Sequence, residues 1–293
     1  MNIEAMIETY KPEVEKRLFS HVESKAMPHA LQEAMLYSLK AGGKRVRPLL
    51  TMAAADAYGR WTEEALDVAC AVEMVHTYSL IHDDLPAMDD DDLRRGQPTN
   101  HKKFGEAHAI LAGDALLTKS FQVLSQAGGP AAAAWKTEVT ALLAQAAGAE
   151  GMVGGQIADI EGENRSLSLE ELEYIHHHKT GELLAFAVQG GAIAAGAPAQ
   201  DVQHLRAFSK EIGLVFQIKD DILDVEGDAD VIGKPVGSDD GLNKSTYPGL
   251  LGLEGAKEKM NYHYDRALTE LAGTSVDHDG LKTIASYIVE RDR

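Results

Sequence analysis

The sequence contains a single cysteine, Cys70, in 293 residues. This excludes an internal disulfide and any metal site built from several thiolates. Cys70 lies within an apolar run, which favours a packing residue in a reducing compartment. We therefore expect a cytoplasmic protein.

Basic residues are also scarce: 28 Lys and Arg stand against 46 Asp and Glu, for a net charge of −18. This balance argues against general binding of nucleic acid or of anionic membranes. Long apolar runs are missing as well, because Gln189, Gly190 and Pro198 interrupt the least polar stretch, residues 183–199. We therefore expect that stretch to be a bundle helix and predict no membrane span. Residues 1–17 are amphipathic and lack the apolar core of a signal peptide.

Aspartates, by contrast, gather in two clusters, residues 83–92 and 220–224, and each cluster follows a long apolar stretch. Acidic side chains beside buried surface need a partner. Mg²⁺ is suitable, since it typically binds one or two carboxylates together with waters and substrate phosphates. The clusters therefore predict Mg²⁺ as cofactor and a phosphorylated substrate.

The helical period dominates the rest of the chain, and strand signals are few. Residues 62–84 are apolar on nearly every side, which predicts a central helix surrounded by others. Residues 201–225 place apolar side chains at steps of three, four and seven, so that the second aspartate cluster ends one helix face. Thr62 and Ser168, each followed by acidic residues, are typical helix caps.

Glycine and proline predict breaks between these helices. We find no linker-like segment and no internal repeat, and therefore expect a single all-α domain over 1–293, a large helical bundle whose two aspartate-bearing helices face each other across a cavity. The predicted breaks are Gly42–Gly43, Pro86, Gly96–Pro98, Gly128–Pro130, Gly154–Gly155, Glu161–Ser166, Gly196–Pro198 and Gly227–Gly241.

Basic residues lie next to several of these breaks. The run of residues 42–48, Gly-Gly-Lys-Arg-Val-Arg-Pro, combines flexible backbone with three cations, a composition that binds diphosphate through amide groups and charged hydrogen bonds. Arg94-Arg95, Lys179-Thr180-Gly181 and Gly233-Lys234-Pro235 repeat the pattern. Each run alone is ordinary surface charge, but together they predict a diphosphate site.

Five segments carry a resemblance to a known family: IHDDLPAMDDDDLRRGQPTNH, GGKRVRP, HKTGELL, FQIKDDILD and KSTYPGLLG. In this order they resemble the trans-isoprenyl diphosphate synthases, most closely the bacterial farnesyl diphosphate synthases, and the resemblance runs from about residue 30 to the end of the chain. It implies an all-α bundle around a deep cavity, usually homodimeric.

The resemblance also implies roles for individual residues. One set of aspartates would hold Mg²⁺ against an allylic diphosphate, and a set of cations would contact the same diphosphate. A further set would bind isopentenyl diphosphate, and two oxygen-bearing side chains would lie near the reacting cation. The aspartates that would hold Mg²⁺ are Asp83, Asp84, Asp89, Asp220, Asp221 and Asp224, and the cations on the allylic diphosphate are Arg94, Lys179 and Lys234. The residues that would bind isopentenyl diphosphate are Gly43, Lys44, Arg47, His76, Arg95 and Lys244. The oxygen-bearing side chains near the reacting cation are those of Thr180 and Gln217.

The implied reaction is a Mg²⁺-dependent prenyl transfer. Isopentenyl diphosphate condenses with dimethylallyl and then geranyl diphosphate by ionisation, condensation and elimination, and the departing diphosphate accepts the proton. Tyr78, five positions before Asp83, would lie a little over one helical turn below the cavity mouth and limit the product to farnesyl diphosphate. A geranylgeranyl diphosphate synthase is the alternative within the family.

Other interpretations concern single features. His82-Asp83 is the dipeptide of HD-type metal phosphohydrolases, which need further upstream histidines. Residues 224–230 resemble the start of a calcium loop, but Ala229 and Pro235 occupy its required glycine and acid positions. A terpene cyclase typically has one aspartate-rich motif and a differently composed second one. Residues 176–178 are three consecutive histidines, and they do not predict a metal site because adjacent positions on a helix point in different directions. We expect Asp159 to lie behind the metal ligands. We expect Asp90, Asp91 and Asp92 to lie in solvent.

Overall fold

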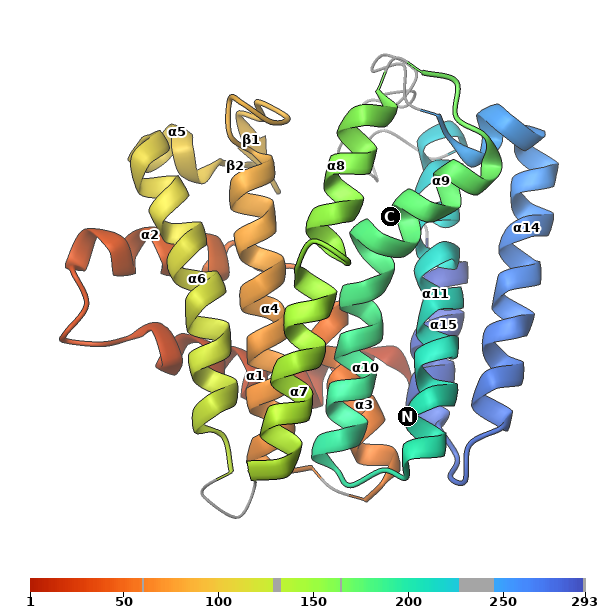
Figure 1. The fold of residues 1–293 in the computed structure, drawn as a ribbon, viewed down its shortest axis with the longest axis horizontal. Helices are drawn as coiled ribbons and strands as arrows, with labels where there is room; N and C mark the ends of the chain where they lie inside the picture. The colour runs from red at the N-terminus through yellow and green to blue at the C-terminus, as the bar shows by residue number, and fades with distance from the viewer. Residues whose placement is uncertain (60, 129–132, 164, 227–244, 292–293) are drawn as a thin grey trace.

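The protein is described by a computed structural model that covers residues 1–59, 61–128, 133–163, 165–226 and 245–291. Helices pack side by side into one bundle, and the paired strands of the described residues are two residues long (Figure 1). The predicted all-α class is confirmed. The elements are α1 (Ile3–Val22), α2 (His29–Lys40), α3 (Val46–Ala57), α4 (Glu63–Asp83), β1 (Leu93–Arg94), β2 (Gln97–Pro98), α5 (Asn100–Phe104), α6 (Glu106–Gln126), α7 (Ala133–Ala147), α8 (Met152–Gly162), α9 (Leu169–His176), the π-helical turn η2 (His177–Gly181), α10 (Glu182–Ala194), α11 (Ala199–Glu226), α14 (Tyr247–Ala272) and α15 (Asp279–Glu290).

Helix α4 is the central helix that its composition predicts. It packs against α1, α3, α6 and α10, and α10 in turn packs against α11. The side chain of Thr62 caps α4 by accepting from the amide of Ala65, and Ser168 forms a capping box with Glu171 at the start of α9. Because α4 and α11 run in the same direction, their aspartate-bearing ends lie at the same end of the bundle (Figure 1). Within the described residues, no helix is both long and apolar enough to span a bilayer.

One predicted break is wrong, because Gly154 and Gly155 lie inside α8. Lys179-Thr180-Gly181 does not lie next to a break either, because η2 joins α9 to α10 without interruption. Gly155 serves tertiary packing, because a Cβ atom there would approach the backbone nitrogen of Lys179 to 2.2 Å. The break expected at residues 227–241 lies outside the described residues.

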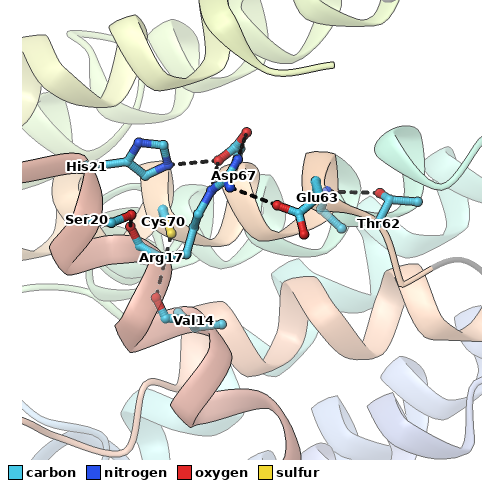
Figure 2. Close-up of polar contacts among 9 residues, drawn as sticks. Val14, Arg17, Ser20, His21, Thr62, Glu63, Asp67 and Cys70 are labelled. Carbon is cyan, nitrogen blue, oxygen red and sulfur yellow. Dashed lines mark hydrogen bonds and ion pairs between the residues drawn. The ribbon is translucent and has the colours of Figure 1, made fainter. Parts of the chain in front are cut away.

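A polar cluster ties α1 to the first half of α4 (Figure 2). Arg17 donates to Asp67 at 2.8 and 3.0 Å and to Glu63 at 2.8 Å, and a ring nitrogen of His21 lies 2.8 Å from Asp67. Burial alone would raise the pKa of Asp67, but the hydrogen bonds from His21 and Arg17 outweigh it and hold this pKa below its ordinary value. Nearby, the Cys70 thiol donates to the carbonyl of Val14 at 3.8 Å, and burial raises the pKa of this thiol.

Asp67 should therefore stabilise the fold in a pH-dependent way. Its folded pKa is depressed, so its contribution is complete above the ordinary value of 3.8 and is lost as pH falls through the lower folded value. We expect Asp67→Asn to lower the free energy of unfolding by about 2 kcal/mol at neutral pH, with a smaller loss in acid. Urea unfolding at several pH values measures this. Glu63→Gln is the control, since Glu63 binds the same arginine but its side chain is 71% exposed; equal losses in both variants would contradict the assignment.

Candidate active site

The first aspartate cluster begins where α4 ends. Asp83 is the last residue of α4, Asp84 is its C-cap, and the amide of Asp89 donates to the carbonyl of Asp83 at 2.9 Å. Burial raises the pKa of Asp83 to about 6; Asp89 and Asp84 add to the shift, while Lys179 and Arg94 oppose it. Crowded carboxylates of this kind are stabilised by a nearby cation.

Asp84 and Arg94 form an ion pair in which the carboxylate is buried and the guanidinium is partly exposed. Nη2 and Nε of Arg94 lie 2.6 and 2.8 Å from one oxygen of Asp84, whose side chain is 4% exposed. A predicted metal ligand is thus paired with a predicted diphosphate contact. Asp90, Asp91 and Asp92 are exposed, as expected, and Asp92 pairs with Lys102 at 2.6 Å.

The second cluster is anchored by the carboxyl-terminal part of the chain. The amide of Tyr247, at the start of α14, donates to Asp221 at 2.9 Å. Arg291 reaches Asp220 at 2.6 Å and lies over the ring of Phe216, 4.2 Å from its centroid. Asp224 follows one turn later on α11. Motif reasoning did not find Tyr247 or Arg291 as partners, because nothing in the sequence relates them to α11.

The π-helical turn η2 lies between α8 and α11. Because Gly155 of α8 lets the η2 backbone approach closely, Asp159 one turn later meets Lys179 at 2.5 Å. Burial would lower the pKa of Lys179, but Asp159, Asp83 and Asp89 raise it above its ordinary value. Lys179 therefore stays protonated next to the first aspartate cluster. Asp159 acts through Lys179, which fits a place behind the predicted metal ligands.

On its other side, η2 packs closely against α11 at a second glycine, Gly213. A Cβ atom at Gly213 of α11 would lie 3.0 Å from the Cα atom of Gly181. Gln217, one turn after Gly213, accepts a hydrogen bond from the Thr180 hydroxyl at 3.1 Å. The structure thus brings Thr180 and Gln217 together.

The glycine-rich turn before α3 carries the predicted cations. Gly43 has a φ of +117°, and a Cβ atom there would come within 2.5 Å of the Arg95 guanidinium, which donates to the Gly42 carbonyl. Lys44 lies over the ring of Tyr287, 5.3 Å from its centroid. Arg45 serves another purpose: it is buried and bonds Glu73 at 2.6 Å and Glu15 at 3.1 Å.

Arg47 and His76 lie behind this turn. Burial lowers the pKa of Arg47 to about 10, although Glu73 opposes the shift, and its buried Nε has no hydrogen-bond partner. Burial also holds the pKa of His76 well below its ordinary value, with Arg47, Arg95, Arg94 and Arg45 as further causes. A neutral histidine within reach of several arginines is the arrangement that an anion would complete. Lys234 and Lys244 lie outside the described residues.

The histidines argue against the metal sites that their sequence suggests. A ring nitrogen of His82 lies 3.1 Å from the carbonyl of Ile110, so His82 faces α6. His176 stacks on Tyr247, whereas Nδ1 of His178 lies 2.7 Å from the Tyr174 carbonyl. These contacts favour neither a His82–Asp83 metal pair nor a shared site for the consecutive histidines.

The residues present fit a hard divalent cation. No three His, Cys, Asp or Glu side chains of the described residues form a ready-made metal cage. Mg²⁺ needs no such cage, because one or two carboxylates suffice when waters and substrate phosphates complete its shell. The raised pKa of Asp83 and the oxygen donors of both clusters suit this mode of binding. A polar cavity of about 160 Å³ lies beside the second cluster, and its lining includes Asp159, Lys179, Gln217 and Asp221.

Comparison with known proteins points in the same direction. The family model described as Polyprenyl synthetase matches residues 28–278. A protein of Bacillus subtilis (strain 168) named farnesyl diphosphate synthase is 54% identical over 283 residues, which are 96% of this chain and 96% of that protein. The farnesyl diphosphate synthase of Geobacillus stearothermophilus is 51% identical over 293 residues, 100% of this chain and 99% of that protein. The apo crystal structure of an FPP/GFPP synthase from Zymomonas mobilis has a TM-score of 0.86 and 37% identity, covering 98% of both chains.

Proposed function

The chain belongs to the polyprenyl synthetase family and has its all-α fold, and on that premise we propose that it is a prenyltransferase producing farnesyl diphosphate. It joins isopentenyl diphosphate to dimethylallyl diphosphate and then to geranyl diphosphate. The observation that carries this proposal is the position of Lys179 in η2, which lies next to Asp83 and Asp89 of the first cluster and lines one cavity with Asp221 of the second. A geranylgeranyl product is the alternative, and relatives named farnesyl diphosphate synthase favour the shorter one.

The acidic clusters would hold Mg²⁺ and with it the allylic diphosphate. The proposed metal ligands are Asp83, Asp84, Asp89, Asp220, Asp221 and Asp224. Without metal, these carboxylates would repel a diphosphate. Asp84 also holds Arg94 in place. When bound, Mg²⁺ neutralises the diphosphate and stabilises it as a leaving group. Lys179, kept protonated by Asp159, adds a fixed positive charge, and Arg94 and Lys234 complete the contacts.

The isopentenyl diphosphate binds on the basic side without metal. Gly43, Lys44, Arg47, His76, Arg95 and Lys244 provide its contacts, and burial of Arg47 strengthens the attraction. The Thr180 and Gln217 oxygens stabilise the allylic cation through neutral dipoles, which do not capture it as a carboxylate would. The departing diphosphate takes the proton, so the chain itself supplies no general base.

Incubation of the purified chain with Mg²⁺, isopentenyl diphosphate and each allylic primer tests the function. We expect a C15 diphosphate as the main product and no turnover in EDTA. Phosphate release from nucleotides, without prenyl products, would instead support the phosphohydrolase.

Product length should depend on Tyr78. Its side chain is buried within α4, and burial together with Asp83 raises the pKa of Tyr78 to about 12, so the phenol stays neutral. We expect Tyr78→Ala to remove the floor beneath the growing chain and shift the main product from C15 to C20 or longer, with the KM for isopentenyl diphosphate little changed. Chromatography of the dephosphorylated products measures this, and Tyr78→Phe is the control that keeps the ring. A C15 product from active Tyr78→Ala protein would place the length determinant elsewhere.

The assembly and the compartment are further parts of the proposal. Helix α6 exposes the apolar side chains of Ile110 and Leu111, 42% and 58% accessible, and a second copy of the chain would cover this surface. Light scattering should give a particle of twice 31.6 kDa. The buried Cys70 thiol fits the cytoplasm, and we treat residues 1–293 as one polyprenyl synthase domain.

A further inference from the structure

The ring of Tyr78 packs against the imidazole of His82. The His82 imidazole lies one turn further along α4, and its ring meets the Tyr78 ring edge to face, with centroids 5.6 Å apart and an interplanar angle of 80°. A phenol that stops a growing chain must keep its orientation when the chain presses on it. The neighbouring ring restricts that rotation.

His82 is itself fixed by α6. One of its ring nitrogens lies 3.1 Å from the Ile110 carbonyl and 4.0 Å from a carboxylate oxygen of Asp114. Gly113 makes this approach possible, because a Cβ atom there would lie 2.2 Å from Nε2 and 2.5 Å from Cδ2 of the imidazole. Any larger residue at this position would displace the ring from α6.

We propose that His82 is a positioning residue for product length. Because it contacts both α6 and the Tyr78 ring, it holds that ring in a fixed orientation relative to α6. The inference rests on the proposed function, since it concerns how the same cavity ends. His82 touches neither substrate nor the reacting atoms in this assignment. Its effect is therefore on the distribution of products rather than on the existence of turnover.

Two variants test this role of His82, one in His82 itself and one in α6. His82→Ala removes the imidazole, and Gly113→Ala forces it away from Ile110. In both, we expect the ratio of C20 to C15 product to rise roughly two- to tenfold, the range expected when one aromatic contact is lost. Lys119→Ala, on the same helix but away from His82, should leave the ratio unchanged.

A double substitution separates positioning from general loosening of the fold. In a Tyr78→Ala background there is no ring left to hold, so adding His82→Ala should not raise the ratio further. Additive effects would overturn the proposal, as would a wild-type C20 to C15 ratio in both folded single variants. Absence of prenyl product from the wild-type chain would instead refute the proposed function. Thermal unfolding of each variant shows whether it is folded.

Discussion

Asp83→Ala should lower turnover roughly a thousandfold at saturating substrate, because the loss of a metal ligand removes several kcal/mol of leaving-group stabilisation. Folding should survive. Burial and the neighbouring Asp89 and Asp84 raise the pKa of Asp83, so its ionised form is disfavoured in the folded chain without metal. We therefore expect the Tm without Mg²⁺ to be unchanged or slightly higher, while stabilisation by added Mg²⁺ with an unreactive diphosphate is lost.

Two other aspartates provide the comparison. Asp92→Ala changes an exposed carboxylate that pairs only weakly in solvent with Lys102, and turnover should remain near normal. Asp220→Ala should reduce turnover as Asp83→Ala does, but it also removes the partner of Arg291 and should lower the Tm. Near-normal turnover of Asp83→Ala would show that the first cluster does not hold the metal.

Arg47→Ala should raise the KM for isopentenyl diphosphate roughly a hundredfold, about the cost of removing one partner from a buried charge pair. The KM for the allylic substrate should change little, because Arg47 lies on the basic side of the site. Initial rates with each substrate varied in turn separate the two constants. Arg47→Lys retains the charge without the bidentate geometry and should fall between the wild type and Arg47→Ala.

The reverse result would also be informative. If Arg47→Ala raised both KM values equally, the division into a metal side and a basic side would be wrong. A drop in Tm without any change in KM would mean that Arg47 only serves packing beside Glu73.

The helices that carry the site could be predicted from the sequence because their signals are local. The apolar surface of α4 and the stripe on α11 are read directly from helical spacing, and Thr62 and Ser168 mark the starts of α4 and α9 through short-range capping. The motif resemblance then locates the aspartates at the ends of these helices, and their alignment at one end of the bundle follows from packing.

Long-range contacts escaped prediction. Arg291 and Asp220 are 71 positions apart, and no local pattern couples them. Gly154 and Gly155 predict a break because glycine is locally a helix breaker, whereas the close approach of η2 explains the absence of a side chain at Gly155. In the Lys44–Arg47 run, composition alone could not show that Arg45 turns inward to Glu73, since that depends on where α3 begins.

The turn η2 has a consequence for how this site tolerates change along the chain. A π turn holds one residue more than the α-helical turn it replaces, so it is an insertion that the helix has absorbed. Deleting one residue near the start of α9 would let η2 relax to regular helix and keep α10 in place, yet it would rotate the residues between the deletion and η2 by about 100°. Length and charge would be almost conserved, but Glu173 and His176 would leave the neighbours they now contact on α14. At this place the number of residues, as much as their identity, is under constraint.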